Sequence, residues 1–346
     1  MLPYIFLYLS VVVFLILYSR TRNKLFYWFV FLFLVVFSSF RFEVGADYNN
    51  YYSMFLDFKY GVAPFEFEPL NMLIVDSVYA VGLDVYFIFF IYALLILYSL
   101  FFFIDKFSPS PSLSVLLFFL IGLYFLSTLN GLRQWAAISM MLFMISSILS
   151  RRYFLAIAFY FLAVMFHVSA IVLFVLFFMR IRWRLSIILI ASVAVISLAG
   201  VLTTLLEATD YRRYISGYGH DIPYNHYYLI IYVASLLLFP FLFSYFNKER
   251  YLDGVSVFLL NMNIVSFFII VFGVVSGFSF LIFMRMNMYF QVQFLILIPI
   301  FLMRFESRFR VVFTFAIFLI LSLYFFHLLY FNGEKYKILP YKSIFG

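Results

Sequence analysis

The chain has 346 residues, of which 67% are hydrophobic and 11% charged, and its mean hydropathy is +1.11. Soluble domains average about 45–50% apolar and about 25% charged residues, so this chain has too little polar material to cover a soluble surface. The composition predicts an integral membrane protein and excludes soluble enzymes, nucleic-acid-binding modules and disordered chains. The net charge of +8 lies in short basic clusters between apolar runs, which is typical of membrane topology and does not indicate a nucleic-acid partner. The absence of cysteine excludes disulfides, thiolate metal sites and a cysteine nucleophile.

Long apolar runs predict a single all-α transmembrane domain over residues 1–346, with ten to twelve crossing helices. A crossing helix needs about 20 apolar residues, and continuous rather than alternating runs exclude a barrel. The predicted spans are Leu2–Tyr18, Leu25–Phe40, Val85–Ile104, Ser112–Leu129, Arg133–Leu149, Tyr153–Met179, Leu185–Leu206, Tyr227–Phe246, Val255–Gly273, Met286–Met303 and Val311–Phe331. The run Pro69–Leu83 is weaker, because Asn71 and Asp76 interrupt it, and it either crosses or lies in the interface.

Basic clusters orient these helices, because Lys and Arg are enriched in cytoplasmic loops. The clusters predicted to be cytoplasmic are Arg20, Arg22 and Lys24; Arg180, Arg182 and Arg184; Lys248 and Arg250; and Arg304, Arg308 and Arg310. Two longer loops, near residues 41–68 and 207–226, then face outwards. Arg151 and Arg152 also have the pattern of a cytoplasmic cluster, which leaves Tyr153–Met179 starting and ending on one side. Either this helix breaks near His167 and returns, or Pro69–Leu83 crosses and Arg151 and Arg152 lie outside.

An ionisable residue within a span costs at least about 2.5–3.5 kcal/mol to insert, which makes each one a candidate for function. The first group follows the second span. There Gly45 permits a tight turn, and Asp47 is predicted to cap a helix running to about Lys59. One side of that helix is aromatic, with Tyr48, Tyr51, Tyr52 and Phe55. Arg41 either anchors an aromatic belt or binds an anion at the outer mouth.

Three further ionisable residues stand alone in apolar surroundings. Arg133, followed by Gln134, is either a snorkelling side chain or a buried cation whose fork matches phosphate oxygens. His167 lies in the middle of an apolar run and is either a core residue or a group that exchanges a proton near neutral pH. Arg285 and Tyr289 are four residues apart and share a helix face.

Weaker candidates lie in the two outer loops. They are Glu66, Glu68, Asp210, Arg212, Arg213, His220, Asp221 and His226, and the last six also fit an ordinary solvated loop. No nucleotide-binding or zinc-protease motif occurs, and the four histidines lack metal-ligand spacing. The sequence therefore predicts neither a cofactor nor a metal. A site with two or three arginines suits a substrate that carries phosphate or pyrophosphate.

Six short motifs, in order, resemble those of the EpsG-like, Wzy-type polysaccharide polymerases. They are Arg41-x-x-x-Gly45-x-Asp47-Tyr48-x-x-Tyr51, Glu68 before a weak span, Asn130-x-x-Arg133-Gln134-x-Ala136, Phe166-His167-x-Ser169-Ala170, Arg285-x-x-x-Tyr289-Phe290 and Pro340-Tyr341. The resemblance covers nearly the whole chain, and the order and spacing of the motifs carry it.

The resemblance implies a glycosyltransferase with many helices, similar to other lipid-dependent glycosyltransferases. Such enzymes join undecaprenyl-pyrophosphate-linked oligosaccharide repeat units into O-antigen or capsular polysaccharide, without a nucleotide sugar. They act at the outer face of the bacterial inner membrane, with the active site towards the periplasm. Their partners are the lipid-linked oligosaccharide, the bilayer, a flippase and a chain-length regulator.

The chemistry of this reaction assigns a role to each candidate residue. Breaking a sugar–pyrophosphate bond places negative charge on the leaving group, which Arg133, Arg285 and Arg41 are predicted to stabilise. The acceptor hydroxyl must lose a proton, with His167 as the first choice of base and Asp47 or Glu68 as the second. The remaining predicted substrate contacts are Tyr48, Tyr51, Gln134 and Tyr289.

Alternative functions share part of this pattern. A flippase of lipid-linked oligosaccharide also needs cations for pyrophosphate, but it should show two similar halves and charges at the midplane of several helices. An O-antigen ligase uses the same donor, and only the motif order argues against it and against a membrane acyltransferase. A scaffold without catalytic activity does not need isolated arginines in apolar surroundings.

Overall fold

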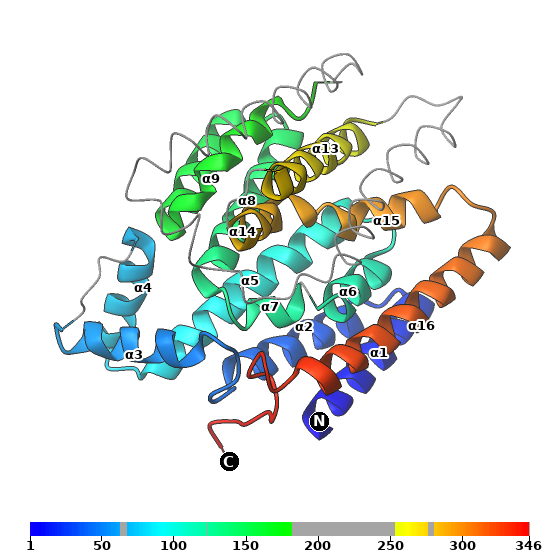
Figure 1. Ribbon diagram of the computed structural model, residues 1–346. Helices are drawn as coiled ribbons and strands as arrows, with labels where there is room; N and C mark the ends of the chain where they lie inside the picture. Colours follow the sequence, from blue (N-terminus) through cyan, green and yellow to red (C-terminus); the bar gives the residue numbers. More distant parts are fainter. Residues whose placement is uncertain (63–67, 123, 182–252, 276–279, 346) are drawn as a thin grey trace. The chain divides into compact units, whose positions relative to one another are not determined.

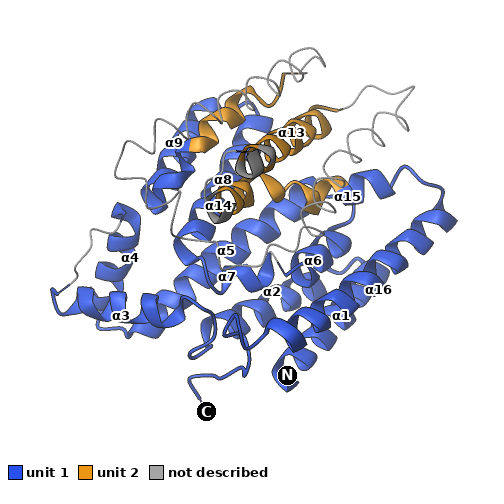
Figure 2. Cartoon of the chain, in the orientation of Figure 1, with its two compact units in different colours: residues 1–171, 298–346 blue, residues 172–297 orange. Residues whose placement is uncertain are grey.

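The computed structural model describes residues 1–62, 68–122, 124–181, 253–275 and 280–345 (Figure 1). Within these ranges the chain folds into helices and contains no strand, which confirms the predicted all-α class for the described part. The chain forms two units (Figure 2). Unit 1 comprises Met1–Ile171 and Ile298–Gly346, and unit 2 comprises Val172–Leu297.

The helices begin and end where local sequence signals place them. Those within unit 1 are α1 (Leu2–Thr21), α2 (Lys24–Ser39), α3 (Tyr48–Lys59), α4 (Pro69–Ala80), α5 (Val85–Phe107), α6 (Pro111–Leu120), α7 (Phe125–Thr128), α8 (Leu132–Leu149), α9 (Tyr153–Phe166) and α16 (Ser307–Asn332). Proline occupies the first turn of α1, α4 and α6, where its missing N–H removes no helical hydrogen bond. Between α1 and α2, Arg22 is left-handed and the Asn23 side chain accepts a hydrogen bond from the Leu25 amide.

Unit 2 and its boundaries contain the other described helices. The 3-10 helix η1 (Val168–Phe178) crosses the boundary, α13 (Gly254–Val275) and α14 (Phe280–Gln291) lie in unit 2, and α15 (Phe294–Leu302) leads back to unit 1. Buried polar side chains join the helices of this unit: Asn261 Nδ2 donates to the Met179 carbonyl at 2.8 Å, and Ser266 Oγ to Asn287 Oδ1 at 2.6 Å. Such bonds hold apolar helices together where lipid provides no hydrophobic driving force.

The number of candidate membrane spans is smaller than predicted. Among the described residues, α1, α5, α8 and α16 are long and apolar enough to cross, and a fifth span exists if Phe283–Gln291 and Phe294–Leu302, bent by 44°, count as one. The helices α2, α6 and α9 are apolar but shorter. The predicted spans Leu185–Leu206 and Tyr227–Phe246 lie outside the described residues. A count of ten to twelve spans is therefore not confirmed.

The predicted span Ser112–Leu129 is wrong as a single helix, because it is divided into α6 and the short α7. The break contains Gly122, the residue type that stabilises a helix least apart from proline. A Cβ at Gly122 would lie 2.7 Å from Leu328 Cδ1 on α16, so a larger residue here requires the Leu328 side chain to move.

The segment predicted as Tyr153–Met179 is also broken, and here the break was one of the two alternatives. The helix α9 ends at Phe166, and His167 is extended, with φ −158° and ψ 119°. The backbone continues as η1. The helix α4, the competing candidate for a crossing, has only 12 residues.

Charged and polar contacts distinguish the two ends of the helices in unit 1. Lys24 pairs with Asp105 at 2.8 Å, and Lys106 Nζ donates to Ser146 Oγ at 2.7 Å, which places the start of α2 and the ends of α5 and α8 together. We call this the basic end, because Arg151 and Arg152 follow α8 directly. The helices α2 and α8 each have their other terminus at the opposite end.

At that opposite end, the C-terminal tail (residues 333–345) packs against the turn that follows α2. The Phe42 amide donates to the Lys342 carbonyl at 2.9 Å, and the Gly45 amide donates to the Lys337 carbonyl at 2.7 Å. The Tyr341 ring stacks on Phe37 with centroids 4.1 Å apart. The last residues of the chain therefore hold the turn of residues 40–47 in place.

Candidate functional site

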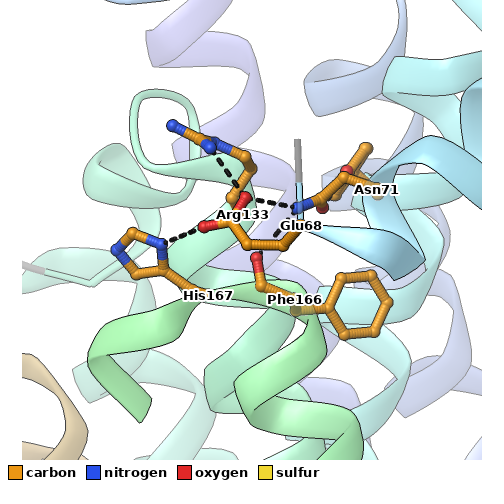
Figure 3. Close-up of polar contacts among 6 residues, drawn as sticks. Glu68, Asn71, Arg133, Phe166 and His167 are labelled. Atoms are coloured by element: carbon orange, nitrogen blue, oxygen red, sulfur yellow. Dashed lines mark hydrogen bonds and ion pairs between the residues drawn. The ribbon is translucent and has the colours of Figure 1, made fainter. Parts of the chain in front are cut away.

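Glu68 is the centre of a polar cluster in unit 1 (Figure 3). Its Oε2 accepts hydrogen bonds from Arg133 Nη1 at 2.7 Å and from Asn71 Nδ2 at 3.0 Å. Its Oε1 lies 3.0 Å from Nδ1 of His167. We call these four residues the Glu68 cluster. It brings together two predicted catalytic residues, Glu68 and His167, and one of the predicted arginines.

Each of the three charged or titratable members lies at the end of a helix. Glu68 precedes Pro69, the first residue of α4, and has the extended backbone that a residue before proline prefers. Arg133 is the second residue of α8, and His167 follows the last residue of α9. Their side chains meet because the three helix termini meet, and α4 packs against α9 as α9 does against α8.

The sequence analysis missed the roles of two residues that support the cluster. Asn71 is fully buried, and its Nδ2 donates a second hydrogen bond, to the Phe166 carbonyl at 2.9 Å. The Tyr92 hydroxyl, also buried, donates to Asn71 Oδ1 at 2.5 Å. Asn71 was visible as a polar interruption of an apolar run, whereas Tyr92 lies within an apolar run as an ordinary aromatic residue.

The electrostatics of the cluster separate the two predicted bases. Burial by itself would raise the pKa of the Glu68 carboxyl, but the hydrogen bond with His167 and the charge of Arg133 outweigh burial and lower that pKa to about 2. A carboxylate this acidic is a poor base at neutral pH. His167 directs Nδ1 to Glu68, so that Nε2 is the nitrogen left to accept a proton from a substrate.

The cluster is partly open to its surroundings. Exposed fractions of the side chains are 12% for Glu68, 27% for Arg133 and 28% for His167. A substrate can therefore reach the imidazole and the guanidinium while the carboxylate stays largely covered. This arrangement can take a proton from a hydroxyl and stabilise an adjacent anion.

Arg41 contacts backbone carbonyls rather than the Glu68 carboxylate, and its role in anion binding stays a prediction. It is 1% exposed, and it donates from Nε to the Val44 carbonyl at 3.1 Å and from Nη2 to the Leu129 carbonyl at 3.1 Å. Its Nη1 donates to the Ser38 carbonyl. Burial lowers the pKa of Arg41 to about 10, so the guanidinium remains charged at neutral pH. Arg41 joins the end of α2 to the turn before α8.

Three aromatic residues of α3, Tyr48, Tyr51 and Phe55, are buried, and Tyr48 and Phe55 contact Phe89 on α5. Tyr48 is 1% exposed and stacks on Phe89 with centroids 4.8 Å apart, and a contact of its ring with a sugar stays a prediction. Tyr51, 9% exposed, is a hydrogen-bonding neighbour of Arg133. Asp47 precedes α3 as predicted, but its side chain makes no capping hydrogen bond, and no ion pair of it occurs among the described residues.

The remaining predicted residues are Gln134 in unit 1, Arg285 and Tyr289 in unit 2, and those outside the described chain. Gln134 is buried on α8. Arg285, exposed, and Tyr289, fully buried, lie on α14 in unit 2, so their participation in the Glu68 cluster stays a prediction. Glu66 and the loop of residues 207–226 fall outside the described residues. In the described part, no group of three or more His, Asp or Glu is arranged to hold a metal.

The described fold and site define a helical membrane protein with a carboxylate–histidine pair and an arginine at helix ends. The chain belongs to the EpsG family, whose model matches residues 24–343. Members of this family are Wzy-like polymerases, which confirms the family resemblance and indicates a membrane polysaccharide polymerase-like function. No curated protein and no solved structure matches the chain.

Proposed function

We propose that the protein joins undecaprenyl-pyrophosphate-linked oligosaccharide repeat units into O-antigen or capsular polysaccharide at the outer face of the bacterial inner membrane. The observation that carries the proposal is the contact of Glu68 with both His167 and Arg133. This contact provides, in one place, a base for a hydroxyl and a cation for a pyrophosphate.

In the proposed reaction, His167 is the general base. The acceptor hydroxyl, at the non-reducing end of a new lipid-linked unit, attacks the anomeric carbon of the growing chain. The new glycosidic C–O bond forms as the bond from that carbon to the pyrophosphate oxygen breaks, and the hydroxyl proton moves to His167 Nε2. The Glu68 carboxylate accepts the Nδ1 hydrogen bond, which orients the ring and stabilises the imidazolium.

Arg133 serves the leaving group. Undecaprenyl pyrophosphate departs with the electron pair of the broken bond, and a guanidinium is matched in shape to phosphate oxygens. Arg133 is held by Glu68 through Nη1 at 2.7 Å before any substrate binds. A cation that is already in place needs no reorganisation when charge develops on the leaving group.

The charge distribution supports an outward-facing site. Lys24, Lys106, Arg151 and Arg152 share the basic end of unit 1, which the bias of Lys and Arg towards cytoplasmic loops assigns to the cytoplasm. Arg133 is at the other end of α8. This helix has 18 residues and is about 27 Å long. We infer that the Glu68 cluster lies in the outer half of the membrane.

The proposal is tested by complementation of a polymerase-deleted host. His167→Ala, Arg133→Ala and Glu68→Gln are expressed singly, surface polysaccharide is resolved on a gel, and the amount of each variant in the membrane is measured. We expect wild type to restore a ladder and each variant to give single-repeat product, with polymerisation reduced at least about 100-fold.

Matched controls separate chemistry from the general effect of removing a charge. His327→Ala removes an exposed histidine on α16, and Arg308→Ala removes an exposed arginine at the start of that helix. Both should leave the ladder intact. The proposal fails if wild type restores no ladder, if repeat units do not reach the outer face without this protein, as for a flippase, or if its product is single units on lipid A core, as for a ligase.

A further inference from the structure

The Asn71 side chain on α4 hydrogen-bonds both Glu68 and the end of α9. It is fully buried, and every polar atom of its amide group is used. Its Nδ2 donates to Glu68 Oε2 at 3.0 Å and to the Phe166 carbonyl at 2.9 Å, while its Oδ1 accepts from the Tyr92 hydroxyl at 2.5 Å. These partners determine the amide orientation, because two acceptors face one side and a hydroxyl donor faces the other.

The bond to Phe166 fixes the backbone beside His167. The last carbonyls of a helix have no helical partner and need another donor. Because α9 ends at Phe166 and His167 is extended, the Phe166 carbonyl is one of these groups, and Asn71 supplies its donor. The imidazole is therefore attached to a backbone position that α4 holds.

The bond to Glu68 fixes the carboxylate. Asn71 and Arg133 both donate to Oε2, which turns Oε1 towards His167 Nδ1. One amide group thus constrains both members of the Glu68–His167 pair, the carboxylate directly and the imidazole through its backbone.

We propose that Asn71 is a positioning residue for the Glu68–His167 pair, with Tyr92 setting the orientation of its amide. This inference rests on the proposed function and names a residue on which that chemistry depends. Asn71 does not act on the substrate. It holds the carboxylate and the imidazole at the separation at which the imidazole is oriented to accept a proton.

The test is Asn71→Asp, assayed with detergent-solubilised protein and undecaprenyl-pyrophosphate-linked repeat units extracted from the polymerase-deleted host. The substitution replaces a donor by a second carboxylate oxygen beside Glu68. Like charges at this distance raise the pKa of a carboxyl group. The charged and titratable groups facing the pair are Arg133 on α8, His167 after α9, Tyr92 on α5 and, beside Arg133, Tyr51 on α3.

We expect Asn71→Asp to lower kcat at least about tenfold, leave KM within about twofold, and move the acid limb of the pH–rate profile upwards. Tyr92→Phe, which keeps the ring and removes the orienting donor, should lower kcat by a smaller factor of about two to five. The control is Ser99→Ala, which removes a buried hydroxyl that bonds only the Ile96 carbonyl of its own helix α5. It should leave kcat and the pH profile unchanged.

The outcomes distinguish this inference from the proposed function. If Glu68→Gln and His167→Ala lose activity while Asn71→Asp and Tyr92→Phe keep the wild-type kcat and pH profile, the positioning role is overturned and the polymerase function stands. A kcat loss that matches a fall in Tm, with an unchanged pH profile, also overturns it. If Asn71→Asp does not fold, Tyr92→Phe alone decides. If wild type forms no polymer from these units, the proposed function itself fails.

Discussion

Arg41 and Arg133 stand in similar sequence contexts and have different roles in the structure. Each follows or begins an apolar helix in unit 1, and each was predicted to bind an anion. Arg41 is buried and donates to three backbone carbonyls, whereas Arg133 is partly exposed and pairs with a carboxylate. Backbone carbonyls hold the Arg41 side chain in place, and Arg41 in turn joins the segments that carry these carbonyls. The Glu68 carboxylate, which also contacts His167, holds Arg133 next to a group that can exchange protons.

The largest effect is expected for Arg41→Leu, which leaves three buried carbonyls without their donor. We expect the free energy of unfolding to fall by about 3 kcal/mol or more. Thermal unfolding in detergent and the membrane level of the variant measure this loss. Activity per folded molecule should stay near wild type, and a folded but inactive Arg41→Leu protein would contradict the structural role.

Glu68→Gln should show the opposite result. The neutral side chain keeps its shape but no longer stabilises an imidazolium, so we expect activity to fall at least about 100-fold while Tm falls less than in Arg41→Leu. In vitro polymer formation and a thermal melt of the same preparation check both parts. If Tm falls as far as in Arg41→Leu, the Glu68 cluster is as structural as the Arg41 turn, and the contrast between the two arginines disappears.

Gly45→Ala tests the close approach of the turn of residues 40–47 to the Leu129 carbonyl. Gly45 has φ +111°, and a Cβ there would lie 2.7 Å from the Leu129 carbonyl oxygen that Arg41 also binds. We expect a loss of stability of about 1–3 kcal/mol, seen as a lower Tm with activity per folded molecule retained. An unchanged Tm would show that the approach of this turn to α8 is not close in solution.

The low pKa of Glu68 predicts a pH dependence with a defined sign. A carboxyl whose pKa falls from 4.5 to about 2 on folding adds stability above pH 4.5, and this contribution is lost as the pH falls towards 2. The Tm difference between wild type and Glu68→Gln should therefore be constant from neutral pH to about pH 5 and shrink below it. A difference that already shrinks near pH 6 would show that the pair does not lower the pKa.

The smallest effect is expected at the exposed ion pair between the tail and the turn. Lys342 Nζ lies 2.6 Å from Glu43 Oε2, but the two side chains are 52% and 42% exposed. Lys342→Ala should change the free energy of unfolding by less than about 1 kcal/mol, as measured by thermal unfolding. A larger loss would show that this ion pair, rather than the backbone hydrogen bonds, holds the tail on the turn.

Much of the fold was predictable because bilayer crossing makes apolar length visible in the sequence. The runs at α1, α5, α8 and α16 needed no tertiary information. The division of α6 from α7 was not predicted, although the run contains Gly122, a residue type that weakens helices. The predicted number of membrane crossings was also larger than the four or five candidate spans among the described helices.

The sequence singled out three of the four residues of the Glu68 cluster, Glu68, Arg133 and His167, but not their arrangement. Isolation in apolar sequence singled out Arg133 and His167, since such residues are expensive in a membrane. The same reasoning selected Arg41, because a sequence does not show whether the donors of an arginine will find carbonyls or a ligand. Asn71 was noticed only as a polar interruption of an apolar run. Its role depends on the end of α9 at Phe166, whose carbonyl accepts its hydrogen bond.

The docking of the C-terminal tail on the turn after α2 has a consequence for the synthesis of the protein. Glu43 and Lys342 are separated by 299 positions, and the Gly45 amide of the turn donates a hydrogen bond to the Lys337 carbonyl. During vectorial synthesis the turn emerges early and waits for nearly the entire chain before its partners exist. Contacts between such distant segments form late and slowly. A chain interrupted before α16 therefore inserts its first helices but leaves the turn of residues 40–47 without its partners, so this turn is completed only after residues 333–345 have been made.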